Sequence, residues 1–125
     1  MARKRFGQHF LHEQGVIDRI LSMLSPAPDD ALVEIGPGQG ALTTPLLDRV
    51  ARLSVIEIDR DLVADLHARA STDTRLDVIE GDALRIDYAA LAAERGRALR
   101  LVGNLPYNIS SPLLFALLAS SAPIT

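Results

Sequence analysis

A glycine-rich segment near the start of the chain has the composition of a loop that holds a ligand. Residues 36–40 have the sequence GPGQG and directly follow the apolar residues 31–35. Glycine lets the backbone approach a bound molecule closely at a strand-to-helix turn. Gly36 and Gly38 are therefore candidate cofactor contacts, although a tight turn alone also favours glycine. With Ala41 as the third small residue, the segment also fits a dinucleotide fingerprint. No Lys followed by Ser or Thr stands at phosphate-loop spacing, which argues against a nucleotide triphosphatase.

Two acidic residues lie at the ends of later apolar stretches. Glu57 lies near the end of residues 53–58, and a carboxylate there can accept hydrogen bonds from both ribose hydroxyls of an adenosine-type cofactor. Asp82 follows residues 76–79 and can accept a hydrogen bond from the exocyclic amine of the cofactor's adenine. The alternatives are an ordinary surface acid for Glu57 and a turn aspartate for Asp82.

Residues 104–107 have the groups needed to make an aromatic amine reactive. Such an amine is a poor nucleophile because its lone pair is delocalised into the ring, and two fixed acceptors on its N–H groups pull the nitrogen towards a pyramidal geometry. The Asn104 side-chain carbonyl can be one acceptor, and the backbone carbonyl of Leu105, held outward by Pro106, can be the other. Tyr107 offers a ring on which a flipped base can stack. In isolation, an Asn-X-Pro turn with a surface tyrosine explains the same residues.

These candidate residues fall at strand ends in a chain that alternates strands with helices. Four strands are expected, at residues 31–35, 53–58, 76–79 and 99–102. Helices are expected at residues 13–24, 44–50, 60–70, 88–94 and 111–119, and a loop at 104–107. Thr44 is the expected N-cap of the second helix, with Pro45 as its first residue. This alternation predicts an α/β fold with a parallel sheet, in which ligands bind at the carboxyl ends of the strands.

The composition is that of an ordinary globular domain. The chain has 125 residues, of which 48% are hydrophobic and 23% charged, and its net charge is −3. It has no cysteine, which excludes disulfides, cysteine-ligated zinc and a thiol nucleophile. His9 and His12 have no compact acidic cluster beside them, so no metal site is expected. No apolar stretch approaches the roughly 20 residues of a membrane span, and a cytoplasmic protein without a membrane partner is expected.

Positive charge is concentrated at the amino terminus. Arg3, Lys4 and Arg5 give residues 1–12 three basic side chains and no acidic one, whereas the rest of the chain is acidic. A basic arm on an acidic body can attract the phosphate backbone of a nucleic acid. These three residues are therefore candidate nucleic-acid contacts, and a solvated terminus is the plainer alternative.

Three of these segments together resemble a known family. Residues 34–40 resemble the first motif of S-adenosylmethionine-dependent methyltransferases, and residues 103–110 resemble the fourth motif of the RNA adenine-N6 dimethyltransferases. Residues 3–11 are similar to the amino-terminal motif of that second family. The resemblance covers almost the whole chain. It implies a Rossmann-like fold, S-adenosyl-L-methionine as cofactor, and methylation of adenine N6 in RNA.

For the cofactor, the resemblance implies a role at five matching positions. His9 and Leu11 would lie over the methionine part, and Gly36 would approach the cofactor from below. Glu57 would hold the ribose, and Asp82 would meet the adenine amine. His9 is a departure, because the family usually has asparagine there, but histidine can still donate a hydrogen bond to the cofactor.

For the reaction, the resemblance places Asn104 between cofactor and target base, and Tyr107 against that base. The implied partner is ribosomal RNA of the small subunit, with dimethylation of two adjacent adenines expected during ribosome biogenesis. An alternative within the family is the large-subunit RNA adenine methylase of the macrolide-resistance type. Outside the family, a nicotinamide-dependent oxidoreductase would suit the glycine loop and Glu57, and a non-catalytic RNA-binding module would suit the basic arm.

The resemblance also predicts that the chain is the amino-terminal part of a longer protein. Family members continue with further strands and a small helical domain. We therefore divide the chain into a basic arm with a cofactor-covering motif over residues 1–12 and an amino-terminal part of the catalytic domain over residues 13–125. Self-association is expected, because strand 99–102 would lie at the open edge of the sheet beside an uncovered apolar helix at residues 111–119.

Overall fold

The computed structural model describes the backbone of residues 14–106 and 112–119 and the side chains of residues 14–103. The helices are α2 (Gln14–Leu24), α3 (Thr43–Leu47), α4 (Arg60–Ala70), the 3-10 turn η1 (Ala83–Arg85) and α5 (Tyr88–Arg95). The strands are β1 (Ala31–Ile35), β2 (Leu53–Glu57), β3 (Leu76–Glu80), β4 (Leu99–Pro106) and β5 (Pro112–Ala119). The predicted alternation of strands and helices is confirmed as far as β4.

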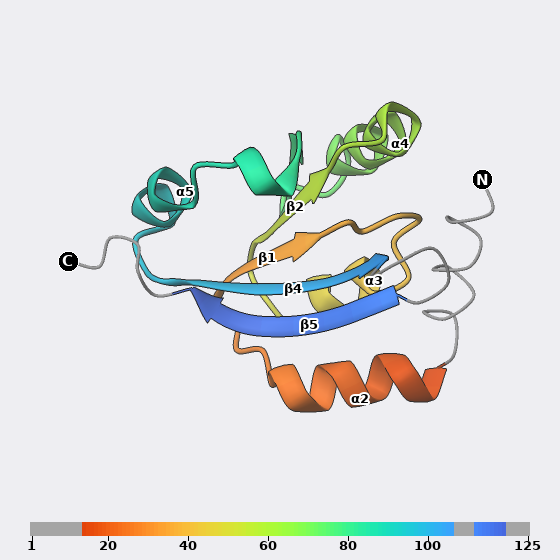
Figure 1. Cartoon of the computed structure of the whole chain (residues 1–125), viewed down its shortest axis with the longest axis vertical. Coiled ribbons are helices and arrows are strands. Elements are labelled where there is room, and N and C mark those ends of the chain that lie inside the picture. Colours follow the sequence, from red (N-terminus) through yellow and green to blue (C-terminus); the bar gives the residue numbers. More distant parts are fainter. Residues whose placement is uncertain (1–13, 107–111, 120–125) are drawn as a thin grey trace.

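The strands form one sheet in the order β3-β2-β1-β4-β5 (Figure 1). The first four strands are parallel, as predicted, and β4 lies beside β1. In the register of the sheet, Ile35 pairs with Ile56 on one side and with Gly103 on the other, and Glu57 pairs with Glu80. The carboxyl ends of all four parallel strands therefore meet at one edge of the sheet.

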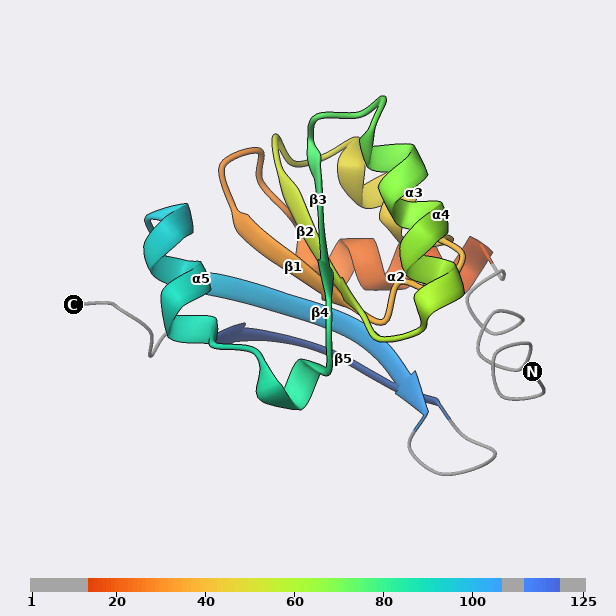
Figure 2. The same ribbon diagram turned by 90° about the horizontal axis from the view of Figure 1, so that it is seen from above.

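Helices cover both faces of the sheet. One apolar core lies under α2, α3 and α4, and a second lies between the sheet and α5 with η1 (Figure 2). Side chains of β1 alternate between the two cores, with Leu32 in the first and Val33 in the second. None of the helices in residues 14–103 is long and apolar enough to cross a lipid bilayer.

Asp59 caps α4, whereas the predicted start of α3 is wrong. Asp59 accepts hydrogen bonds from the backbone N–H groups of Asp61 and Leu62, as an N-cap does. Helix α3 begins at Thr43, and Leu42 precedes it without a side-chain cap. The reason is that the Thr44 N–H already bonds the carbonyl of Gly40 at 3.2 Å, so the first turn begins inside the glycine loop.

The helix predicted at residues 111–119 is also wrong. Pro112–Ala119 forms β5, which pairs antiparallel with β4 along its whole length. A short, unbroken apolar run fits a buried strand as well as a helix, and here the run pairs with the backbone N–H and C=O groups along the edge of β4. The argument for self-association that rested on an open edge of β4 therefore loses its basis.

The same pairing explains why the predicted loop at residues 104–107 is wrong over its first three residues. Asn104, Leu105 and Pro106 continue β4, opposite Leu114, Leu113 and Pro112. The pairing ends where two prolines face each other, because proline has no N–H to donate. Tyr107 lies outside the described residues.

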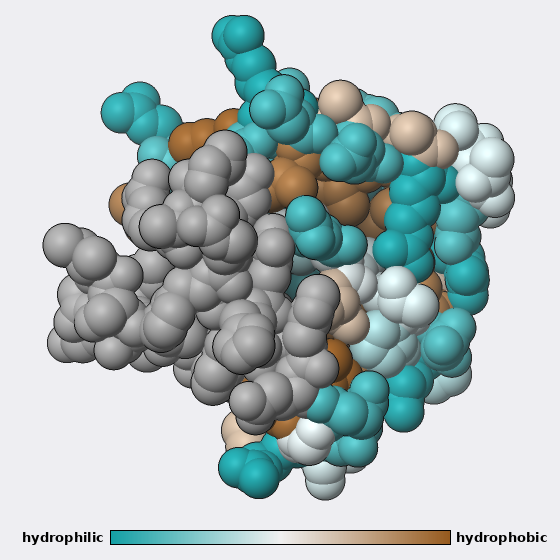
Figure 3. Space-filling view, turned by 90° about the vertical axis from the view of Figure 1, so that its right-hand side faces the viewer, coloured by the Kyte–Doolittle hydropathy of each residue, from teal (hydrophilic) through white to brown (hydrophobic). Residues whose placement is uncertain are grey.

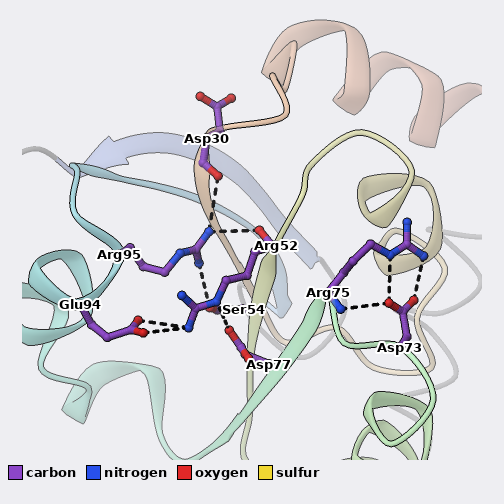
Figure 4. A network of polar contacts seen from close by, with 8 residues as sticks. All are labelled: Asp30, Arg52, Ser54, Asp73, Arg75, Asp77, Glu94 and Arg95. Atoms are coloured by element: carbon purple, nitrogen blue, oxygen red, sulfur yellow. Dashed lines mark hydrogen bonds and ion pairs between the residues drawn. The ribbon is translucent and has the colours of Figure 1, made fainter.

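A polar network holds the opposite end of the sheet (Figure 4). Arg95, on α5, donates to Oγ of Ser54 at 2.9 Å and to the carbonyl of Arg52 at 3.0 Å. Arg52 itself pairs with Asp77 and, at 3.0 Å, with Glu94. These contacts fix α5 to the amino-terminal ends of β2 and β3, far from the edge where the strands finish.

Candidate functional site

The candidate residues within the described part of the chain gather at the carboxyl ends of the parallel strands. Gly36 follows β1, Glu57 ends β2, Asp82 follows β3 by two residues, and Asn104 comes directly after Gly103 on β4. Figure 3 looks onto this end of the molecule, where hydrophobic side chains lie between hydrophilic ones in the part that is not grey. The remaining candidates lie outside the described residues; they are Arg3, Lys4, Arg5, His9, Leu11 and Tyr107.

The loop after β1 needs its glycines for their backbone conformation. Gly36, Gly38 and Gly40 have φ values of +68°, +58° and +93°, in the left-handed region that other residues rarely adopt. Gly36 N–H donates to the carbonyl of Ile56 at 2.9 Å, which ties the loop to β2. A Cβ built on Gly38 would meet no atom of the described residues within 4 Å, so this side of the loop is open in that part of the chain. The predicted tight approach of backbone to ligand is therefore sterically available at Gly38.

Glu57 is joined directly to that loop. Its Oε1 accepts from the Gly38 N–H at 3.2 Å, and its Oε2 accepts from the N–H groups of Ile58 at 3.1 Å and Asp59 at 3.0 Å. The residue is only 7% exposed, so the alternative of an ordinary surface acid is wrong. Three backbone donors fix the orientation of this carboxylate.

Asp82 is used locally as a cap. Its Oδ1 accepts from the Leu84 N–H at 2.9 Å at the start of η1, and its Oδ2 lies 3.9 Å from Nε of Arg85. The preceding residue, Gly81, donates its N–H to the carbonyl of Glu57 at 2.9 Å. Asp82 is thus held in the strand end next to Glu57, in the conformation expected of a turn aspartate, and its side chain is partly exposed.

Glu34 is a buried acid that was not predicted as a site residue. It is 2% exposed, in the middle of a strand that is otherwise apolar, and accepts a hydrogen bond from Oγ1 of Thr43 at 2.6 Å. Burial raises the pKa of the Glu34 carboxyl to about 7, against the opposing influence of the Thr43 hydroxyl and of the positive charge on Arg69. The sequence feature that could have indicated this residue is a charged side chain inside an otherwise apolar strand.

Within residues 14–103, no group of three or more His, Cys, Asp or Glu side chains is arranged to hold a metal ion. The acids at this edge instead accept hydrogen bonds from neighbouring backbone N–H or side-chain O–H groups. What the site offers in the described residues is an open backbone turn beside a fixed carboxylate, with a second carboxylate one strand further along.

Comparison with known proteins gives relatives that match nearly all of this chain. It is 56% identical over 122 residues to the ribosomal RNA small subunit methyltransferase A of Leptothrix cholodnii, a match that covers 98% of this chain and 44% of that protein. It is also 56% identical to the protein of the same name from Chromohalobacter salexigens, with 98% and 45% covered. The chain therefore spans less than half the length of these curated relatives.

Solved structures of similar fold are more distant in sequence. A dimethyladenosine transferase from Plasmodium falciparum is 23% identical, with a TM-score of 0.54 over 72% of this chain and 41% of that chain. The 23S rRNA methyltransferase ErmE is also 23% identical, with a TM-score of 0.55 over 74% of this chain and 47% of that chain. These likenesses confirm the predicted fold class, Rossmann-like with its strands mostly parallel.

The family model described as ribosomal RNA adenine dimethylase matches residues 1–125. Because that match takes in every residue, the chain belongs to the ribosomal RNA adenine dimethylase family.

Proposed function

We propose that this chain carries the cofactor-binding and base-binding part of an enzyme that dimethylates adenine N6 in ribosomal RNA, with S-adenosyl-L-methionine as methyl donor. The observation that carries the proposal is the family match over residues 1–125, and the contact between Gly38 and Glu57 supports it. A nicotinamide-dependent oxidoreductase would account for Gly38 and Glu57, but for neither the family match nor Asn104. An RNA-binding module would not explain the glycine loop.

The small-subunit RNA is the substrate that the relatives favour. The relatives above 50% identity carry "small subunit" in their names, whereas the likeness to ErmE is one of fold alone. The proposed product is a pair of adjacent dimethylated adenines. We place the protein in the cytoplasm, where ribosomal subunits of bacteria are assembled.

The described residues fit the adenosine part of this cofactor. A carboxylate has about four lone-pair positions, and three backbone N–H groups use three of those on Glu57. The remaining acceptor capacity suits a ribose hydroxyl. Gly36 and Gly38 would hold the cofactor through their backbone, since among the described residues no atom lies within 4 Å of a Cβ built on Gly38. Asp82 would accept from the adenine amine through its second oxygen. When bound, S-adenosyl-L-methionine supplies a methyl group made electrophilic by its sulfonium.

Catalysis would then depend on how the chain holds the target amine. Asn104 and the carbonyl of Leu105 lie at the end of β4, one strand away from the glycine loop. As acceptors for the two N–H groups of adenine N6, they would localise its lone pair, and water would take the proton that leaves. Pro106 would fix the direction of the Leu105 carbonyl, and Tyr107 would stack on the base. Positioning of the amine would supply most of the rate enhancement.

The segment before α2 completes the proposed site. His9 and Leu11 would cover the methionine part of the cofactor. Arg3, Lys4 and Arg5 would bind the RNA backbone, so residues 1–12 would act as an arm and residues 13–125 as part of the catalytic domain. Replacing the three basic residues with alanine should lower RNA affinity and flatten its dependence on salt, while the affinity for S-adenosylhomocysteine stays the same. An unchanged salt slope would favour a solvated terminus.

Ligand binding separates the candidate functions. We expect S-adenosylhomocysteine to raise the melting temperature of the chain and NAD to leave it unchanged, because no residue of the proposed site is assigned to binding nicotinamide. Stabilisation by NAD alone would favour the oxidoreductase. Stabilisation by RNA without either nucleotide ligand would favour the binding module.

Transfer of a labelled methyl group to small-subunit ribosomal RNA tests the reaction. Asn104→Ala should reduce methyl transfer far more than RNA affinity, because its role is at the reacting amine. Tyr107→Phe should keep activity and Tyr107→Ala should lose it, since stacking requires the ring and not the hydroxyl. A phenylalanine variant as inactive as the alanine variant would contradict the stacking role.

A further inference from the structure

Helix α3 comes directly after the glycine loop and is so short that its position depends on contacts with other elements. It has five residues, and its N-cap residue, Leu42, makes no side-chain capping hydrogen bond. Its first two residues instead bind to other elements. Thr43 donates its hydroxyl to Glu34 on β1 at 2.6 Å, and Oγ1 of Thr44 accepts from Nη2 of Arg69 on α4 at 3.0 Å. The start of α3 is therefore held from the sheet and from the neighbouring helix.

Arg69 reaches the glycine loop as well as α3. Its Nη1 lies 3.2 Å from the position that a Cβ on Gly40 would occupy, so the guanidinium packs against the Cα of this glycine. Gly40 has a φ of +93°, and its carbonyl accepts from both the N–H of Thr44 at 3.2 Å and the hydroxyl of Thr44 at 3.3 Å. Arg69, Thr44 and Gly40 thus form one contact group at the end of the loop.

The two ends of the loop are held by the same strand–helix unit. Glu57, at the end of β2, accepts from Gly38, and Arg69, in the last turn of α4, packs on Gly40. The positive charge of the half-buried Arg69 also opposes the rise in the pKa of the buried Glu34 carboxyl. Arg69 therefore acts on the loop by contact and on Glu34 through its charge.

We propose that Arg69 is a positioning residue that holds the Gly36–Gly40 loop in its cofactor-binding conformation through Thr44 and Gly40. This inference rests on the proposed function. It concerns a residue that does not touch the cofactor but affects how tightly the loop binds it. The loop's three left-handed glycines leave it many conformations when free, and the Arg69 contact removes part of that freedom before binding. Its loss should weaken cofactor binding more than it weakens folding.

Arg75 provides a matched control. It donates from Nη1 to the carbonyl of Leu47 at 2.7 Å, at the other end of α3, and pairs with Asp73 at 2.8 Å. It supports the same helix without touching the glycine loop in the described structure. A role of Arg69 in helix stability alone would be shared by Arg75, whereas a role in the loop would not.

The test is calorimetric titration of the whole chain with S-adenosylhomocysteine, alongside urea unfolding of each variant. We expect Arg69→Ala and Thr44→Val each to raise the dissociation constant about three- to tenfold, the range for losing one hydrogen bond. The double variant should lose less affinity than the sum of the two single losses, because both changes remove the shared contact between Arg69 and Thr44. Arg69→Lys should recover part of the affinity, since an ammonium can still donate to Thr44. Arg75→Ala should leave the dissociation constant within about twofold of the wild-type value.

Three outcomes would overturn the inference. They are an unchanged dissociation constant in Arg69→Ala, fully additive losses in the double variant, and an equal loss of affinity in Arg75→Ala. The last would show that α3 stability alone matters. Failure of the wild-type chain to bind S-adenosylhomocysteine would instead overturn the proposed function, and with it the reason for holding the loop.

Discussion

The backbone N–H of Gly38 donates to Oε1 of Glu57 across 3.2 Å, which joins the loop after β1 to the end of β2. The two residues are 19 positions apart in sequence but belong to adjacent parallel strands, whose carboxyl ends lie side by side. The Glu57 carboxylate therefore fixes the loop through this contact and also keeps acceptor capacity for a ligand. A change at Glu57 should therefore affect both binding and stability.

Glu57→Gln tests this double role. Glutamine replaces one acceptor oxygen with an NH2 group, so at least one of the three backbone donors from Gly38, Ile58 and Asp59 loses its partner. We expect affinity for S-adenosylhomocysteine to fall by about 1–3 kcal/mol in calorimetry, the range for hydrogen bonds to a charged group.

Glu80→Gln is the control for that measurement. Glu80 pairs with Glu57 in the sheet register and also ends a strand, but its side chain is exposed. Its substitution should leave affinity and stability close to those of the wild-type chain. Equal affinities in the two variants, on folded protein, would remove Glu57 from the site.

Glu34 should make stability depend on pH. Burial raises the pKa of its carboxyl from 4.5 to about 7 in the folded chain. The folded chain then binds more protons than the unfolded chain between these values, so the free energy of unfolding falls as pH rises from about 4.5 to about 7. This contribution is fully present below that range and lost above it.

Glu34→Gln should remove that dependence. The amide carbonyl can still accept from Thr43, and no charge has to be buried at high pH. At pH 8 the variant should be up to about 3 kcal/mol more stable than the wild-type chain, given about 1.4 kcal/mol for each pKa unit, and at pH 4.5 it should be no more stable. Urea unfolding across this pH range measures the difference. A variant that keeps the wild-type slope would place the titrating group elsewhere.

Local patterns in the sequence were enough to predict most of the fold as far as β4. The strand ending at Ile35 stands before a glycine-rich turn, and Asp59 stands before an amphipathic helix, where a capping side chain is needed. These signals lie within a few residues of the structure they specify. The neighbouring positions of Gly38 and Glu57 followed because parallel strands bring their carboxyl ends together.

Contacts between distant residues could not be predicted in this way. The pairing of Arg69 with Thr44 joins positions 25 apart, and nothing near either residue indicates the partner. Thr44 was expected to cap a helix, which is the common use of threonine before proline, but its N–H and its hydroxyl are both directed to Gly40. The strand at Pro112–Ala119 was missed because its uniform apolar character carries no period that separates strand from helix.

The polar network around Arg95 should contribute more to stability than the ion pairs beside it. Arg95→Ala removes the donor that serves Ser54, which is 1% exposed, and should cost about 1–3 kcal/mol because a buried hydroxyl loses its partner. Arg52→Ala removes ion pairs whose side chains are 41% exposed for Arg52 and 38% for Asp77, and should cost less than about 1 kcal/mol. Urea unfolding of both variants checks the order, and an Arg52 variant that is the less stable of the two would contradict it.

The antiparallel pairing of β5 with β4 can be tested with an engineered disulfide. Val102 lies opposite Ala116 in the register, and residues directly opposite in an antiparallel pair have Cα atoms about 4.5–5.5 Å apart. That separation lies within the range that a disulfide spans, about 4.4–6.8 Å. The chain contains no cysteine, so a pair of introduced cysteines has no competing partner.

We expect Val102→Cys combined with Ala116→Cys to oxidise to one intramolecular disulfide, detected by peptide mass spectrometry without reduction. Val102→Cys combined with Leu117→Cys is the control, because a shift of one residue in a strand turns the side chain to the other face of the sheet. This control pair should stay reduced or form slowly, and the bridged pair should need more urea to unfold than its reduced form. A helix at residues 112–119 would not align Val102 with Ala116 in this register. Equal oxidation of the two pairs, or none in the first, would therefore show that the segment does not pair with β4 in this register.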